Sequence, residues 1–276
     1  MTINAALQRI VISSAQPERM AQFYRDAFDY DSTVAGEEYR CEAVGRSVWI
    51  RPGTSNQLLE SVFTLDSDEA VERYAMELRT RGIVHSFATM HGPAVSVRDP
   101  DGRILCFTVR GPDHSPAAAA GDRARPARLQ HYAIRTSSPQ RLLDFYSNAL
   151  AFTVSDLVRD ADGDLTAAFL RTDAEHHALA IFRAPQSRLD HFSCETRDWN
   201  ALRDWADHMA ARSVQLVWGI GRHGPGNDTF FMVHDPDGNL VEISSDLEIC
   251  SEDRPAGAWE HRMETLNRWG LAIMRS

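Results

Sequence analysis

Residues 129–146 read LQHYAIRTSSPQRLLDFY, a strand-like apolar run followed by a proline and by apolar residues at helical spacing. The same arrangement occurs earlier in the chain, over residues 7–24, which begin LQRIVI. Three positions recur 122 residues later: Pro17, Phe23 and Tyr24 correspond to Pro139, Phe145 and Tyr146. A strand and a helix therefore occur twice in the same frame, which predicts an internal repeat.

Two further pairs of segments extend the repeat along the chain. LESVFTLD at 59–66 parallels LDHFSCET at 189–196, and DPDGRILC at 99–106 parallels DPDGNLVE at 235–242. Each DPDG sequence is typical of a tight turn between two strands. We therefore predict an α+β fold of four β-α-β-β-β modules, paired into two domains with curved mixed sheets.

Composition indicates where the two domains end. Residues 111–127 are rich in Pro, Gly and Ala and are predicted to link a first domain over 1–110 to a second over 128–250. The remaining 251–276 form a tail in which the apolar side chains follow helical spacing, at Trp259, Met263, Leu266 and Trp269. This spacing predicts a short amphipathic helix that covers the mouth of a site, joins a subunit contact or packs on its own domain.

The charge and cysteine content restrict the class of partner. The formal net charge of −10 argues against binding to nucleic acid or an anionic membrane, because there is no surplus of cations to displace counterions. No apolar run approaches the ~20 residues of a membrane span, and the first residues lack the layout of a signal peptide. The four cysteines are too widely spaced for a disulfide framework or a CxxC site. We expect a cytoplasmic homo-oligomer that acts on a small molecule.

The two halves differ at three ionisable positions, and this difference serves as an internal control. The second half has His131, His191 and Glu242 where the first half has Arg9, Ser61 and Cys106. Because side chains alternate across a strand, the three residues face away from the apolar layer and would converge inside a curved sheet. Two imidazoles and one carboxylate form the facial triad that suits Fe(II), with Mn(II) a close alternative. We therefore predict a metal site at His131, His191 and Glu242.

At these positions the sequence resembles the type I extradiol ring-cleaving dioxygenases of the vicinal oxygen chelate superfamily. The resemblance covers nearly the whole chain and is strongest at HYAI (131–134), HALA (177–180), LDHF (189–192) and GRHGPGN (221–227) running on to Glu242. It implies a metal-free first domain and an Fe(II) site in the second, held by His131, His191 and Glu242. It also implies that His177 is an acid–base residue and that His223 hydrogen-bonds a substrate oxygen.

One position departs from the pattern of that family. Three residues before the DPDG turn the family has a tyrosine that hydrogen-bonds the substrate, and this chain has Met232, whose thioether cannot donate. His234 lies two residues further on and would share the strand face of Met232. Trp218, Asn227 and Met232 are expected to contact the substrate.

The predicted function is extradiol cleavage of a catecholic substrate by O2, with Fe(II) as the cofactor. One alternative is a non-redox, metal-dependent isomerase or epimerase of the same fold. Such enzymes usually complete their site with an extra Glu or Gln from the partner module, which Arg9, Ser61 and Cys106 do not offer. The second alternative is a metal-free protein that binds or sequesters a small aromatic ligand; the intact trio argues against it, whereas Met232 keeps it open.

Overall fold

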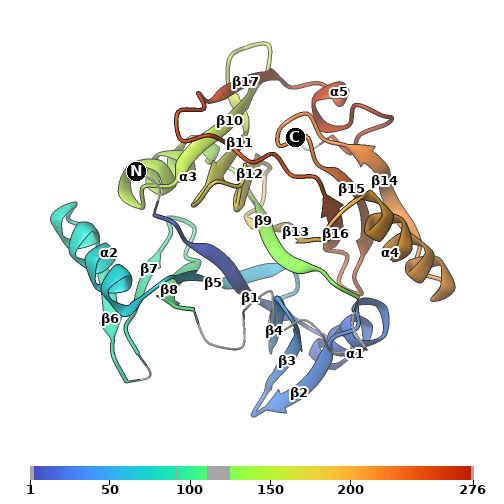
Figure 1. Cartoon of the computed structure of the whole chain (residues 1–276), viewed down its shortest axis with the longest axis horizontal. Coiled ribbons are helices and arrows are strands. Elements are labelled where there is room, and N and C mark those ends of the chain that lie inside the picture. The colour runs from blue at the N-terminus through green and yellow to red at the C-terminus, as the bar shows by residue number, and fades with distance from the viewer. Residues whose placement is uncertain (1–2, 91, 111–124, 275–276) are drawn as a thin grey trace.

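The computed structural model describes residues 3–90, 92–110 and 125–274, and within them the strands form two sheets of similar build (Figure 1). The elements of the first half are β1 (Ala6–Ser14), α1 (Pro17–Phe28), β2 (Asp31–Ala35), β3 (Glu38–Ala43), β4 (Arg46–Pro52), β5 (Gln57–Leu65), α2 (Asp68–Thr80), β6 (His85–Ala88), β7 (Ala94–Arg98) and β8 (Ile104–Val109). The first sheet has the order β2-β3-β4-β1-β5-β8-β7-β6.

The second half repeats this order of elements. They are β9 (Arg128–Thr136), α3 (Pro139–Asp144), the π-helical turn η3 (Phe145–Ala149), β10 (Thr153–Arg159), β11 (Leu165–Arg171), β12 (Leu179–Arg183), β13 (Arg188–Glu195), α4 (Trp199–Ala211), β14 (Leu216–Arg222), β15 (Thr229–His234) and β16 (Leu240–Ser245). The second sheet has the order β14-β15-β16-β13-β9-β12-β11-β10-β17. The predicted α+β fold of four β-α-β-β-β modules is confirmed.

Within each sheet, two modules meet along their first strands. β1 pairs antiparallel with β5, and β9 pairs antiparallel with β13, while the last strand of each module pairs parallel with its first. The helices begin where the sequence predicts, because Pro17 and Pro139 stand in the first turn of α1 and α3. Among the described residues no helix is long and apolar enough to cross a membrane.

The tail is built differently from the prediction. Trp259 lies in a strand, β17 (Gly257–Glu260), which pairs parallel with β10, and the helix α5 spans only Met263–Leu266. The apolar residues of the tail follow helical spacing, but Trp259 lies in extended backbone. Two contacts hold it there: β17 pairs with the edge of the sheet, and Trp259 Nε1 donates to Asp156 Oδ2 (2.7 Å). Of the predicted linker, 111–124 lie outside the described residues.

The two halves are joined through a shared apolar core and two equivalent polar contacts. The hydroxyl of Tyr24 on α1 donates to Asp235 in the second DPDG turn (2.9 Å), and the hydroxyl of Tyr146 on η3 donates to Asp99 in the first (3.1 Å). Tyr24 and Tyr146 are repeat partners, as are Asp99 and Asp235. Each half therefore holds the turn of the other in the same way.

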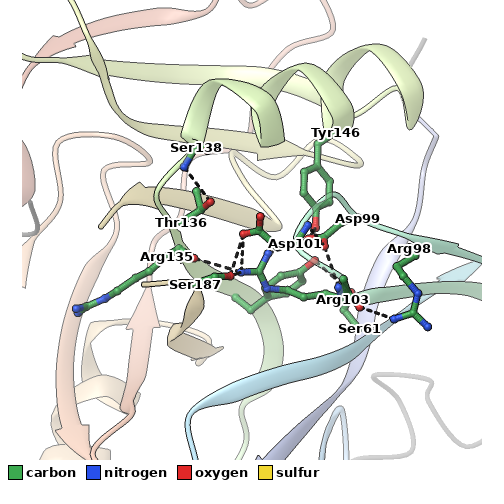
Figure 2. Close-up of polar contacts among 12 residues, drawn as sticks. Ser61, Arg98, Asp99, Asp101, Arg103, Arg135, Thr136, Ser138, Tyr146 and Ser187 are labelled. Carbon is green, nitrogen blue, oxygen red and sulfur yellow. Dashed lines mark hydrogen bonds and ion pairs between the residues drawn. The ribbon is translucent and has the colours of Figure 1, made fainter. Parts of the chain in front are cut away.

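Figure 2 shows the first of these turns and a buried arginine beside it. Arg103 donates from Nη1 to Asp99 (2.9 Å) and from Nη2 to Ser187 and to the carbonyl of Arg135, which belong to the second half. The side chains of Arg103 and Asp99 are 6% and 0% exposed. A buried ion pair of this kind specifies the contact between the halves, since neither charge has water as an alternative partner.

We expect the substitution Arg103→Met to lower the free energy of unfolding by about 3–5 kcal/mol, because it leaves the buried Asp99 carboxylate without its cation. Urea unfolding monitored by tryptophan fluorescence measures this. The matched control is Arg98→Met on the same turn, whose exposed guanidinium bonds only the Gly102 carbonyl and should cost under about 1 kcal/mol. Equal losses for both variants would contradict the assignment.

Candidate metal centre

Three side chains from three neighbouring strands converge inside the second sheet. His131 on β9, His191 on β13 and Glu242 on β16 offer ligand atoms that all lie within 4.8 Å of one another. His131 Nε2 is 3.2 Å from His191 Nε2 and 3.7 Å from Glu242 Oε1. All three residues are buried, Glu242 completely. The structure therefore brings the predicted trio together.

Two β-bulges explain how both imidazoles are oriented. The pairing of β9 with β13 skips Gln130 on one strand and Asp190 on the other, immediately before His131 and His191. In regular strands adjacent side chains point to opposite faces, whereas a bulge lets two consecutive side chains lie on one side. His131 Nδ1 accordingly donates to Gln130 Oε1 (2.5 Å), and His191 Nδ1 donates to Asp190 Oδ1 (2.7 Å).

The donor set fits a divalent metal ion. With each Nδ1–H committed to its neighbour, each Nε2 carries the lone pair and points toward the other two ligands, as metal-binding histidines require. Glu242 Oε1 is buried and has no hydrogen-bond partner among the described residues, which is costly unless a cation accompanies it. Two nitrogens and one carboxylate oxygen suit Fe(II) or Mn(II).

Electrostatics keep these groups in their metal-binding protonation states. Burial lowers the pKa of His131 to about 3, outweighing the opposite effect of Glu242. Burial raises the pKa of Glu242, but the hydrogen bond from His223 and the electrostatic effect of the neighbouring imidazoles lower it to about 2. The imidazole of His131 is therefore neutral and the carboxylate ionised at neutral pH.

A small cavity lies against this trio. Its polar walls are His131, His177, His191, His223 and Thr265, and its apolar walls are Phe169, Phe182, Trp218, Pro225, Met232 and Leu266. The two histidines predicted to act on substrate thus line the same cavity as two of the candidate ligands. Burial lowers the pKa of His177 well below its usual value, with His131 adding to the effect.

The pKa of His223 is shifted in the opposite direction. Its Nδ1 donates to the carbonyl of Leu266 (2.5 Å), and its Nε2 lies 3.4 Å from Glu242 Oε2. Burial lowers the pKa of His223, but the carboxylates of Asp228 and Glu242 outweigh burial and raise it. His223 is therefore suited to donate a hydrogen bond into the cavity.

The predicted substrate contacts divide into two groups. Met232 on β15 and Trp218 on β14 are buried and line the cavity. Asn227 does not: it is exposed in a turn with φ +55°, where its carbonyl accepts a bond from Arg222. His234 shares the alternation of Met232 but lies exposed at the end of β15, so it cannot replace the missing tyrosine.

The strand register corrects one repeat partner. In the second sheet His191 pairs with Ala133, and in the first sheet Glu60 pairs with Val11, the residue equivalent to Ala133. The counterpart of His191 is therefore Glu60, and Ser61 was the wrong choice. A one-residue offset between the halves in this region could not be recognised from the letters LESVFTLD and LDHFSCET.

Three residues that hold the site in place were not predicted from the sequence: Gln130, Asp190 and Asp228. A usable signal existed for the first two, since simple alternation would point these polar side chains at the apolar layer, and such a conflict marks a bulge. Asp228 is completely buried near His223 and Glu242, and neither carboxylate oxygen has a partner in the described part of the chain. Burial raises the pKa of Asp228 to about 7, against the lowering effect of His223.

Comparison with known proteins finds a matching family model and several similar sequences. Residues 128–243 match the model of the Glyoxalase/Bleomycin resistance protein/Dioxygenase superfamily. Metapyrocatechase 2 of Cupriavidus necator is 31% identical over 193 residues, which are 62% of this chain and 59% of the relative. The 3-methylcatechol 2,3-dioxygenase of Pseudomonas putida is 24% identical over 82% of this chain and 85% of its own. The chain thus spans about three fifths of the first relative and most of the second.

Solved structures share the fold over almost the whole chain. A Mn(II)-bound glyoxalase from Novosphingobium aromaticivorans has a TM-score of 0.80 over 99% of this chain and 93% of its own, at 20% identity. The complex of homoprotocatechuate 2,3-dioxygenase from Brevibacterium fuscum with 3,4-dihydroxyphenylacetate has a TM-score of 0.80 over 99% and 91%, at 19% identity. These likenesses establish the fold.

The lowered pKa of His131 predicts how the stability of the metal-free protein depends on pH. Between pH 6.5 and 4.5 the unfolded chain binds a proton at His131 that the folded protein does not, so stability falls as pH falls. Over this window wild type should lose about 2–3 kcal/mol more than His131→Asn, which keeps an N–H donor for Gln130 Oε1 but has no titrating ring. Urea unfolding at several pH values measures the difference, and parallel curves for the two proteins would contradict it. The measurements stop at pH 4.5 because protonation of Glu242 affects the free energy of unfolding mainly below that pH.

Proposed function

We propose that the chain is an extradiol dioxygenase that cleaves an uncharged catechol with O2 at Fe(II), since residues 128–243 match the Glyoxalase/Bleomycin resistance protein/Dioxygenase superfamily and the relatives include a metapyrocatechase and a 3-methylcatechol 2,3-dioxygenase. The resemblance noted in the sequence is confirmed by the family match and the metapyrocatechase relatives. The observation that carries the proposal is the buried convergence of His131, His191 and Glu242, with both imidazoles oriented by their Nδ1 bonds.

The walls of the cavity indicate the class of substrate. Six of its walls are apolar or aromatic side chains, and no arginine among the described residues lines it. A substrate carboxylate bound there would lose its hydration without gaining a cation, which costs several kcal/mol. An aromatic ring with alkyl substituents or none suits these walls, since Phe169, Phe182 and Trp218 pack against apolar faces. We therefore assign the site to catechols without an acidic substituent.

The residues around the cavity divide the work of the reaction. Fe(II), held by His131, His191 and Glu242, would lower the pKa of a substrate hydroxyl group and supply the redox chemistry for the reaction with O2. His223 donates a hydrogen bond to a substrate oxygen, and His177 accepts and returns a proton at the reacting face. The ring bond beside one hydroxylated carbon breaks, and both atoms of O2 enter the product, a ring-opened semialdehyde acid. No external reductant is consumed. Met232 adds only apolar contact where the family has a hydroxyl.

One observation favours a second candidate, a non-redox isomerase or epimerase. Asp228 forms a further group of three potential ligands with His223 and Glu242, and its carboxylate has no partner among the described residues. A fourth protein ligand is what such enzymes use. The geometry of His223 argues against metal binding at that position, because both ring nitrogens face oxygen acceptors, the Leu266 carbonyl and Glu242 Oε2.

We expect turnover of uncharged catechols after anaerobic reconstitution with Fe(II) and addition of O2. Catechol and 3-methylcatechol should give a yellow product with one O2 consumed per ring, at a kcat/KM at least about tenfold above that of 3,4-dihydroxyphenylacetate, which corresponds to ~1.4 kcal/mol. Parallel reconstitution with Mn(II) decides which metal supports the higher rate. Failure to consume any vicinal diol with either metal would refute the proposed activity.

The ligand assignment is tested by metal content. His131→Ala, His191→Ala and Glu242→Ala should each lose iron after gel filtration, whereas His177→Ala should keep iron and lose turnover, because it removes only the proton acceptor. Glu60→Ala is the matched control, since Glu60 occupies the place of His191 in the first sheet and should alter neither iron nor rate. Stoichiometric iron in all three ligand variants would rule out this site.

A further inference from the structure

A second histidine lies directly behind His177, on the side away from the cavity. His176 and His177 are consecutive, and their Nδ1 atoms are 3.0 Å apart, within hydrogen-bond distance. His176 Nε2 in turn lies 3.2 Å from Asp156 Oδ2 on β10. All three side chains are buried, His176 and Asp156 completely. They form a continuous line from Asp156 to the cavity that His177 lines.

The C-terminal tail fixes the Asp156 end of this line. Asp156 Oδ2 accepts from Trp259 Nε1 (2.7 Å), and Oδ1 accepts from the backbone N–H of Gly257 (3.1 Å). Arg254 Nη2 lies 3.1 Å from Oδ1. A Cβ at Gly257 would lie 2.3 Å from Oδ1, so only glycine allows this approach. Burial raises the pKa of Asp156, but His176, Trp259 and Arg254 together lower it, and the group is a carboxylate.

The carboxylate of Asp156 determines which ring nitrogen of His176 carries the proton. A nitrogen lone pair facing Asp156 would be repelled, so His176 carries its proton on Nε2, although this N–H is not aligned well enough to form a regular hydrogen bond. Arg254 already pairs with Asp156, and a cation on the completely buried ring of His176 would lose its hydration, which favours the neutral ring. In the neutral ring of His176, Nδ1 is therefore the acceptor.

We propose that Asp156 and His176 are positioning residues that fix the tautomer of His177, with its proton on Nδ1 and a free lone pair on Nε2 facing the cavity. His177 Nδ1–H donates to His176 Nδ1, and within the described residues no group hydrogen-bonds His177 Nε2. The same logic sets the histidine of a Ser-His-Asp triad, where an aspartate selects the productive tautomer. Here the line is one imidazole longer.

The first half again provides an internal control. By the strand pairing, Gly45 and Arg46 occupy the places of His176 and His177, and the exposed Thr33 occupies the place of Asp156. Arg46 donates to the carbonyls of Phe28 and Ala127 instead. The Asp–His–His line therefore exists only in the half that carries the candidate metal centre, and the common packing of the fold does not require it.

The catalytic consequence rests on the proposed function, whereas the tautomer does not. If catechols are the substrates, the free Nε2 of His177 is ready to accept a hydroxyl proton on binding, without any prior rearrangement. The wrong tautomer would present an N–H at the same point and would have to exchange its proton first. We expect the loss to appear in kcat, with KM nearly unchanged, because the cavity walls are not altered.

The test reads the tautomer directly in the full chain labelled with ¹⁵N-histidine. Long-range ¹H–¹⁵N spectra of the metal-free and Zn(II)-loaded protein, with His177 assigned from His177→Gln, should show protonated Nδ1 and unprotonated Nε2. Asp156→Asn and His176→Leu should move the His177 signals toward protonated Nε2 and lower kcat with Fe(II) about 10²-fold or more. His176→Asn keeps an oxygen acceptor near Nδ1 and should restore the tautomer and most of kcat.

The control variant is Glu248→Gln, which removes a carboxylate bound to the same Arg254 (2.6 Å) without touching Asp156 or His176. It should leave the ¹⁵N signals of His177 unchanged. This result would distinguish the effect of a loosened tail from the effect of breaking the contacts between Asp156, His176 and His177. A wild-type His177 with protonated Nε2, or an unchanged tautomer in both Asp156→Asn and His176→Leu, overturns the inference. Correct tautomers in a protein that consumes no catechol would support the inference and refute the proposed function.

Discussion

The arrangement of the site depends on two β-bulges, at Gln130 and at Asp190. Without them each polar residue would point to the opposite face of the sheet from the histidine that follows it. With them, each imidazole has its Nδ1 proton held by its own chain neighbour, so the two Nε2 atoms face each other at 3.2 Å. Orientation of the ligands is therefore a property of the backbone register, and it exists before any ion binds.

Holding such a site has a cost that the rest of the fold must offset. Glu242 is a completely buried carboxylate whose Oε1 has no hydrogen-bond partner among the described residues, and burying such an atom is costly unless a cation accompanies it. The halves are joined by contacts made twice, Tyr24 to Asp235 and Tyr146 to Asp99, and by a core shared between them. The first half supplies stability without an equivalent metal trio, and the second half can carry polar residues in its interior.

The sequence predicted the modules and the trio because both depend on periodicity and on comparison between the halves. It failed where geometry departs from strict alternation. Glu60 rather than Ser61 is the counterpart of His191, because the halves are offset by one residue there. Asn227 and His234 lie exposed, since a turn and a strand end turn them outward. The tail was predicted as a helix because its apolar spacing fits one, but the edge of β10 offered unpaired backbone groups.

The tail connects these observations. In Figure 1 the chain after β17 returns across the second sheet toward β14, and its contacts are specific: Leu266 and Thr265 line the cavity, and the carbonyl of Leu266 holds His223. Asp156, bound by Trp259 of the same tail, stands behind His177. One segment therefore supports both histidines that line the cavity: a carbonyl accepts from His223 Nδ1, and the carboxylate of Asp156 lies behind His176 and His177. The carbonyl fixes a proton on Nδ1 of His223, whereas the Asp156 line, by our proposal, leaves Nε2 of His177 free to accept.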